Sequence, residues 1–101
     1  MNKYTELSDF EINKKVAEKL GLDYWGAEPN IYVDDYIYSP CANPIQAMPI
    51  IIENKIGLSP MYHSNKWTAD CLDYDFISVN KNPLRAAMEL FLLMKDAENE
   101  G

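Results

Sequence analysis

The C-terminal segment of the chain, residues 82–97, is apolar around most of a helical circumference. At about 100° per residue, one face carries Leu84, Ala87, Met88, Phe91 and Met94, and Ala86, Leu90, Leu93 and Ala97 widen it. Only Arg85, Glu89 and Asp96 form a coherent polar strip. A helix with this pattern must be buried on two sides, so other parts of the chain or a second copy must cover it.

The same segment begins with Asn-Pro, as does the stretch that starts at Asn43. Asn is a favoured N-cap, and Pro at the next position removes an N–H that has no helical partner. We therefore attribute the similarity of the two stretches to helix capping, and not to an internal repeat or a shared active-site motif. Pro49 is expected to kink or shorten the helix that follows Asn43.

A further helix is predicted over residues 8–20. Ser8 and Glu11 have the spacing of a capping box, and Gly21 can adopt the left-handed conformation that ends a helix. The apolar positions recur at every fourth residue: Ile12, Val16 and Leu20.

Short strands are predicted between the last two helices. Residues 56–62 contain Pro60, which restricts them to a sheet edge or a strand start. Residues 67–71 alternate between apolar and polar, and residues 75–79 follow a turn. The β-prone residues 31–38 are either a fourth strand or an extended loop. We predict an α+β fold of three helices packed on a small antiparallel sheet of three or four strands, in the order α-(β)-α-β-β-β-α.

Composition excludes several classes of protein. The 101 residues suit a single domain, 1–101, and 48% hydrophobic with 25% charged residues is typical of a globular chain. Nine basic and sixteen acidic residues give a net charge of −7, which opposes binding to nucleic-acid phosphates. Two cysteines are too few for a secreted disulfide framework. No signal peptide or membrane span is predicted, and we expect a cytoplasmic protein.

No metal or catalytic site is predicted from the cysteines and the histidine. Cys41, His63 and Cys71 lack the paired spacing of a structural zinc site. Nothing in the sequence brings a cysteine and the histidine together with an orienting group, as nucleophilic catalysis requires. We expect Cys71 in the core, Cys41 in a loop and His63 in a turn.

The loop carboxylates offer a second set of potential ligands for a hard cation. They are Asp34, Asp35, Asp70, Asp73 and Asp75. The run over residues 70–75 lacks the glycine turn and the final glutamate of an EF-hand loop, so solvated acids are predicted. No cofactor is expected either, since no glycine-rich phosphate loop occurs.

Aromatic residues crowd residues 24–38 and are candidates for a protein-interaction surface. If residues 31–38 form one strand, Tyr32, Tyr36 and Tyr38 share a face with Asp34. The opposite face then carries Ile31, Val33, Ile37 and Asp35. The aliphatic face would then point inward and leave the tyrosines on the surface or against a partner, the alternative being that they pack over the sheet as part of the core.

The C-terminal helix suggests a second contact surface, with Leu90 and Leu93 on its outer arc. We expect either a weak homodimer through this arc or an intramolecular lid formed by the aromatic residues 24–38. A monomer at high concentration would favour the lid.

Several stretches resemble the NinX-like proteins of tailed phages and prophages. They are "ELSDFEINKKVAEKLGL" (6–22), "NPIQAMPIIIENKIGLSP" (43–60), Trp67 with Ala69, and "NPLRAAMELFLLMKD" (82–96). The resemblance extends more distantly to the phage domain described as an α-β-α sandwich. Residues 23–39 are the least similar part. The resemblance implies a phage accessory protein in a bacterial cytoplasm and supplies no catalytic residues.

We therefore expect a non-enzymatic phage accessory protein that binds another protein, such as a host factor. Its acidic charge suits competition for a basic, nucleic-acid-binding surface. The alternatives are a small metal-dependent enzyme in the acidic loops, and a nucleic-acid binder that stacks bases on a sheet face through Trp67 or the tyrosines.

Overall fold

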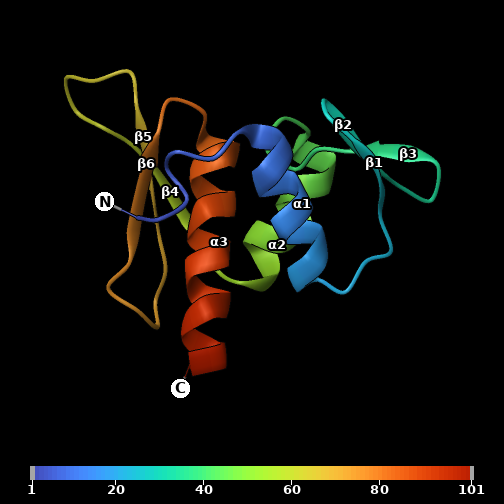
Figure 1. Ribbon diagram of the computed structural model, residues 1–101. Coiled ribbons are helices and arrows are strands. Elements are labelled where there is room, and N and C mark those ends of the chain that lie inside the picture. The colour runs from blue at the N-terminus through green and yellow to red at the C-terminus, as the bar shows by residue number, and fades with distance from the viewer. Residues whose placement is uncertain (1, 101) are drawn as a thin grey trace.

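Three helices and six short strands form within residues 2–100, which the computed structural model describes (Figure 1). The helices are α1 (Asp9–Lys19), α2 (Pro44–Glu53) and α3 (Pro83–Glu100). The strands are β1 (Trp25–Ala27), β2 (Asn30–Val33), β3 (Tyr36–Tyr38), β4 (Gly57–Pro60), β5 (Trp67–Asp70) and β6 (Ile77–Asn80). The predicted α+β class is confirmed.

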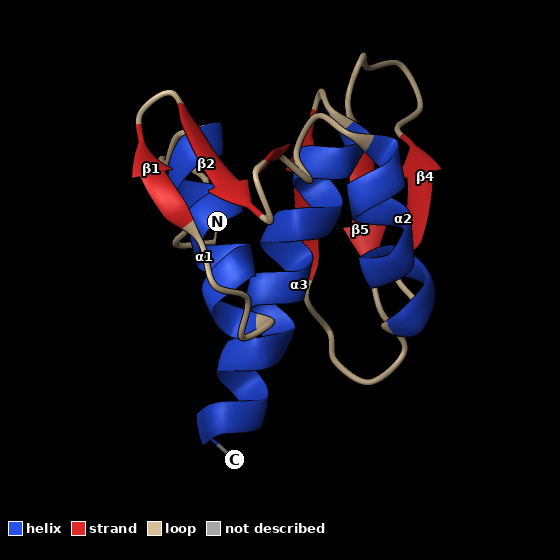
Figure 2. Ribbon diagram, turned by 90° about the vertical axis from the view of Figure 1, so that its right-hand side faces the viewer, coloured by secondary structure: helices blue, strands red, loops and turns tan. Residues whose placement is uncertain are grey.

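The strands form two separate antiparallel sheets that lie on opposite sides of the helices (Figures 1 and 2). Sheet B, in the order β4-β5-β6, is the predicted three-stranded sheet, and Pro60 lies in its edge strand β4 as expected. Sheet A, in the order β1-β2-β3, was not foreseen as a separate sheet. Residues 31–38 are neither one strand nor a loop, because β2 and β3 form a hairpin there.

Local capping chemistry starts the second and third helices, as predicted. The Asn43 side chain accepts a hydrogen bond from the Ile45 N–H at 2.9 Å, and Asn82 accepts from the Leu84 N–H at 2.9 Å. The shared Asn-Pro sequence is therefore a helix start used twice. Pro49 does not end α2, which continues to Glu53.

The ends of α1 also follow the prediction. Ser8 and Glu11 form a complete capping box, in which each side chain accepts from the other residue's backbone N–H. Gly21 has a φ of 72°, and the Leu22 N–H donates to the Ala17 carbonyl at 3.0 Å in a Schellman-type stop.

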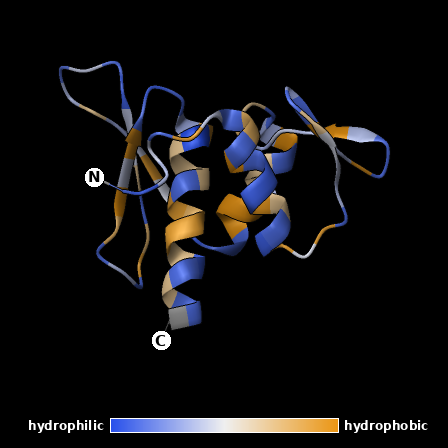
Figure 3. Cartoon of the chain, viewed as in Figure 1, coloured by the Kyte–Doolittle hydropathy of each residue, from blue (hydrophilic) through white to orange (hydrophobic). Residues whose placement is uncertain are grey.

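Helix α3 runs through the middle of the molecule and is covered within the chain. Every residue from Arg85 to Leu92 is buried. Strands β5 and β6 pack on one side, α1 and α2 on the other (Figures 1 and 3). Buried Ser78 of β6 also donates to the Ala86 carbonyl of α3. The predicted burial on two sides is thus met by sheet B and two helices.

Arg85 and Glu89 of the polar strip of α3 are buried under the N-terminal segment. Arg85 is the centre of this contact: its Nε donates to Glu89 Oε2 at 2.6 Å and its Nη1 to Asp9 Oδ1 at 2.6 Å. Its Nη2 donates to the backbone carbonyls of Tyr4 at 3.0 Å and Leu7 at 2.7 Å. One guanidinium therefore joins α3 to the start of α1 and to the chain before it.

Asp96 continues this strip toward the end of α3. Its carboxylate lies 3.0 Å from Lys3 Nζ and 3.4 Å from Lys19 Nζ, and it accepts a hydrogen bond from the Tyr4 hydroxyl. Burial alone raises the pKa of Asp96, but the hydrogen bonds from Tyr4, Lys3 and Lys19 outweigh it, so its net pKa is lowered.

We expect Arg85→Leu to destabilise the protein by about 3–5 kcal/mol in urea unfolding, because it leaves the fully buried Glu89 carboxylate without its cation. The double variant Arg85→Leu/Glu89→Leu should lose less, because it removes both buried charges. Equal losses in the single and double variants would contradict an energetic role for the pair.

Asp96→Asn should lower the free energy of unfolding near neutral pH. A carboxyl with a lowered pKa in the folded state stabilises above its unfolded pKa of about 4, and this contribution is lost as the pH falls through the folded value. The difference between variant and wild type should therefore shrink on acidification. The control Glu98→Gln, in an exposed pair with Lys95, should change little at any pH.

Candidate protein-interaction surface

The hairpin of β2 and β3 is built on a two-residue turn of unusual composition. Asp34 and Asp35 have φ values of 51° and 69°, the left-handed conformation at both central positions of a type I′ turn. Asp adopts this conformation more readily than most residues with a Cβ. The turn pairs Val33 directly with Tyr36, so both point to the same face of sheet A.

This turn overturns the predicted faces of residues 31–38, which assumed continuous alternation. Ile31 and Tyr38 are direct partners, and both are buried in the core. Burial raises the pKa of the Tyr38 phenol to about 12. Tyr38 is therefore a core residue and not part of an interaction surface. Tyr36 shares its face but is 76% exposed, because it lies next to the turn at the free end of the hairpin.

The outer face of sheet A carries a row of three large side chains. The register pairs Trp25 with Tyr32 and Tyr32 with Ile37, one residue from each strand. Trp25 and Tyr32 stack with ring centroids 4.5 Å apart and an interplanar angle of 17°. Trp25 is 57% exposed and Ile37 49% exposed. We call these three residues the aromatic row; Ile37, predicted to point inward, belongs to it.

The close approach of β1 to β2 depends on Gly26, which has a φ of 119°. A Cβ at this position would lie 2.8 Å from the Asn30 carbonyl oxygen and 3.1 Å from Tyr32 Cδ2. The turn that follows contains a cis peptide bond between Glu28 and Pro29. Gly26 therefore permits the strand geometry in which Trp25 and Tyr32 stack.

Acidic residues frame the aromatic row, and residues 23–38 contain no lysine or arginine. Asp23 and Glu28 flank β1 along the chain, and Asp34 and Asp35 form the hairpin turn. The segment itself therefore carries only negative charge, although Glu28 also lines a hollow with Lys14 and Lys15 of α1.

The two leucines predicted on the outer arc of the C-terminal helix are not equivalent. Leu90 is fully buried and cannot contribute to an interaction surface, because sheet B and the other helices enclose α3. Leu93 is partly buried and lines a hollow with Asn2, Phe76 and Ile77. Helix α3 leaves little apolar surface for the predicted dimer, since its apolar circumference is covered inside one chain.

Cys41 is a structural residue. It is fully buried, its N–H donates to Asn13 Oδ1 at 3.1 Å, and its carbonyl accepts from Asn82 Nδ2 at 2.6 Å. Burial, with a smaller contribution from Asp9, raises the pKa of its thiol to about 12. A thiol in this state is a poor nucleophile.

The other two potential metal ligands, His63 and Cys71, lie in separate parts of the structure. His63 lies in a turn with a φ of 61° and packs against Tyr62, and the Cys71 thiol donates to the Tyr74 carbonyl at 3.5 Å. Within residues 2–100, no three His, Cys, Asp or Glu side chains come close enough together to hold a metal ion. Trp67, proposed for base stacking, lies on the same face of sheet B as buried Ala69.

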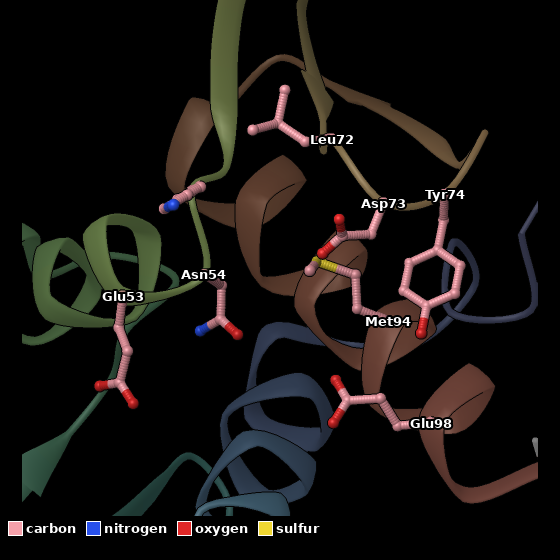
Figure 4. A pocket seen from close by; sticks show the side chains of 8 residues that line it. Glu53, Asn54, Leu72, Asp73, Tyr74, Met94 and Glu98 are labelled. Carbon is pink, nitrogen blue, oxygen red and sulfur yellow. The ribbon is translucent and has the colours of Figure 1, made fainter.

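A pocket of about 340 Å³ lies between the end of α2, the turn before β6 and the C-terminal half of α3 (Figure 4). Its acids Glu53, Asp73 and Glu98 come from three different segments and do not point to a common centre (Figure 4). Its lining contains no cysteine or histidine. The pocket thus offers charge but no nucleophile with an adjacent base.

A family model described as Bacteriophage P22, NinX matches residues 3–95. The chain belongs to this phage NinX family. The match runs through residues 23–39, the part that resembled the family least in sequence. The chain matches no curated protein and no solved structure. Among the described residues of this NinX-family protein, no helix is long and apolar enough to cross a membrane.

Metal removal should leave the fold of this NinX-family protein unchanged. Thermal unfolding with and without a chelator should give the same midpoint, because the folded chain brings no set of three ligand side chains together within residues 2–100. A chelator-induced fall of several degrees, reversed by added zinc, would show that Cys41, His63 or Cys71 binds a metal after all.

Proposed function

We propose that this phage accessory protein acts without catalysis, by binding a protein in the cytoplasm of the bacterial host. The observation that carries the proposal is the aromatic row on the outer face of sheet A. Large exposed aromatic and aliphatic side chains gathered at one place are typical of protein-binding surfaces. Tyr36 lies at the free end of the same hairpin and is the most exposed of the three predicted tyrosines.

The row is ordered before a partner arrives. Trp25 is held against Tyr32 by stacking, and backbone pairing to two strands fixes Tyr32. Side chains that are already ordered lose little conformational freedom on binding. Trp and Tyr are also the residues that most often dominate the binding energy of an interface. Trp25 is therefore expected to be the principal anchor.

The acidic frame favours a partner with a basic rim. Like-charged surfaces slow association, whereas opposite charges steer it and make its rate depend on salt. The four acids of residues 23–38 oppose the binding of a nucleic acid, although the exposed Trp25 ring could stack on a base. A basic, nucleic-acid-binding host protein is the partner class that fits both features.

The test is affinity capture from phage-infected host lysate, with and without nuclease. Wild-type protein should retain a saturable, nuclease-resistant partner. Trp25→Ser should weaken binding to the purified partner at least ~30-fold, the equivalent of about 2 kcal/mol for a principal anchor. The double variant Asp34→Asn/Asp35→Asn should reduce the association rate and its dependence on salt.

Tyr62→Ser is the matched control, because Tyr62 is 89% exposed but lies in the loop between β4 and β5. It should bind as wild type does. The proposal fails if Trp25→Ser and Tyr62→Ser bind equally well, or if nuclease abolishes all capture.

A further inference from the structure

The outer face of α2 is a second apolar surface, separate from the aromatic row. Ile45 is 84% exposed, Met48 42% and Ile52 67%. Their spacing of three and four residues places them in one line along the helix, with exposed Pro49 beside Met48. We call these four residues the α2 face. Figure 3 shows α2 among the strongly hydrophobic segments of the chain.

The α2 face lies in the longest part of the sequence without charge. Residues 36–52 contain no Asp, Glu, Lys or Arg, although a quarter of the whole chain is charged. Each copy carries a net charge of −7, so two copies repel one another over most of their surfaces. They can approach at the lowest electrostatic cost where the fewest acids meet, and the α2 face carries no charge of its own and has only Glu53 adjoining it in α2. A second copy is therefore a suitable occupant of the α2 face.

The α2 face is also complementary to itself. In an antiparallel pair of α2 helices, Ile45 of one copy can lie opposite Ile52 of the second copy, and Met48 opposite Pro49. The same contacts then occur twice about a two-fold axis, as a closed dimer requires. Ile–Ile contacts at both ends and Met48 at the centre fill the space between the helices.

Charges at the helix ends support this register. Glu53 follows Ile52, and in the antiparallel pair it lies beside Pro44 of the second copy, at the N-terminal end of that helix. A negative charge is favourable there, because the helix dipole is positive at its N-terminus. Helix α2 has no acidic residue in its own first turn, so Glu53 of the second copy would supply the negative charge that its N-terminus lacks.

We propose that two copies of this protein form a two-fold symmetric dimer through the α2 face. The face is narrow compared with the roughly 800 Å² that each partner buries in a standard interface, so the dimer should be weak and form at micromolar concentration. The aromatic row is not part of this contact, and the proposal does not depend on the proposed function.

Sedimentation velocity over a range from low to high micromolar concentration tests the dimer. Wild-type protein should shift from monomer to dimer. Ile45→Glu alone and Ile52→Lys alone should each remain monomeric, because each places two charges against apolar side chains in its own dimer. An equimolar mixture of the two variants should form a heterodimer, in which Glu at 45 faces Lys at 52 and the other two isoleucines still meet.

Ile77→Glu is the control for a general effect of an added charge, since Ile77 is 61% exposed on sheet B. It should dimerise as wild type does, and so should Leu93→Glu. Ile45→Glu, Ile52→Lys and Ile77→Glu should unfold at wild-type urea concentrations within error, because these three positions are exposed. Leu93→Glu should unfold at a lower concentration, because Leu93 is partly buried against the core, and its sedimentation is read on the folded protein. A variant that fails this check is replaced by Met48→Lys, which lies next to the proposed axis.

Three outcomes overturn the proposal. The first is a wild-type protein that stays monomeric at the highest concentration, which needs no variant to interpret. The second is a dimer that survives Ile45→Glu. The third is a mixture of Ile45→Glu and Ile52→Lys that stays monomeric, which excludes the antiparallel register. Capture of the host partner by Ile45→Glu should be unchanged, so a failure here is separable from a failure of the proposed function.

Discussion

The buried side chain of Arg85 is the constraint on which the arrangement of this protein depends. It lies on the central helix with only 7% of its side chain exposed, and its donors meet two carboxylates and two backbone carbonyls. A guanidinium cannot lose its proton in a protein, so each of its donors needs an acceptor from the chain. Glu89 on α3 supplies one of those acceptors, Asp9 at the start of α1 another, and the Tyr4 and Leu7 carbonyls before α1 the remaining two. That requirement fixes the N-terminal segment and the start of α1 against α3.

The way in which α3 is enclosed determines which apolar side chains of the other elements stay exposed to solvent. Sheet B occupies one side of α3, and α1 and α2 occupy the other, which places sheet A beyond the helices with only its inner face packed. Ile31 and Tyr38 bury that inner face. The outer face of sheet A and the outer face of α2 then remain in solvent, and both carry large apolar side chains. The exposed surfaces therefore follow from how the central helix is covered.

Local signals in the sequence predicted local structure well. The caps at Ser8, Asn43 and Asn82 and the alternation in β5 depend on neighbours within a few residues, and each was found as expected. The hairpin was missed because Asp-Asp is not the usual Asn-Gly signal of a type I′ turn. Two residues in the turn then reversed the expected alternation, which is why Tyr38 is buried and Ile37 exposed. The polar strip of α3 was visible in the sequence, but nothing local indicated which segment would cover it.

The two exposed apolar surfaces differ in the charge around them, and this difference favours different partners. The aromatic row is framed by acids, so a second acidic copy is repelled there and a basic partner is attracted. The four residues of the α2 face carry no charge, and only Glu53 adjoins them in α2, so this face attracts a basic partner and repels another copy less than the aromatic row does. In the two proposals, electrostatics decides which macromolecules approach each surface, and apolar contact then stabilises the complex. On these proposals, the aromatic row and the α2 face of one small acidic protein bind different partners and do not compete.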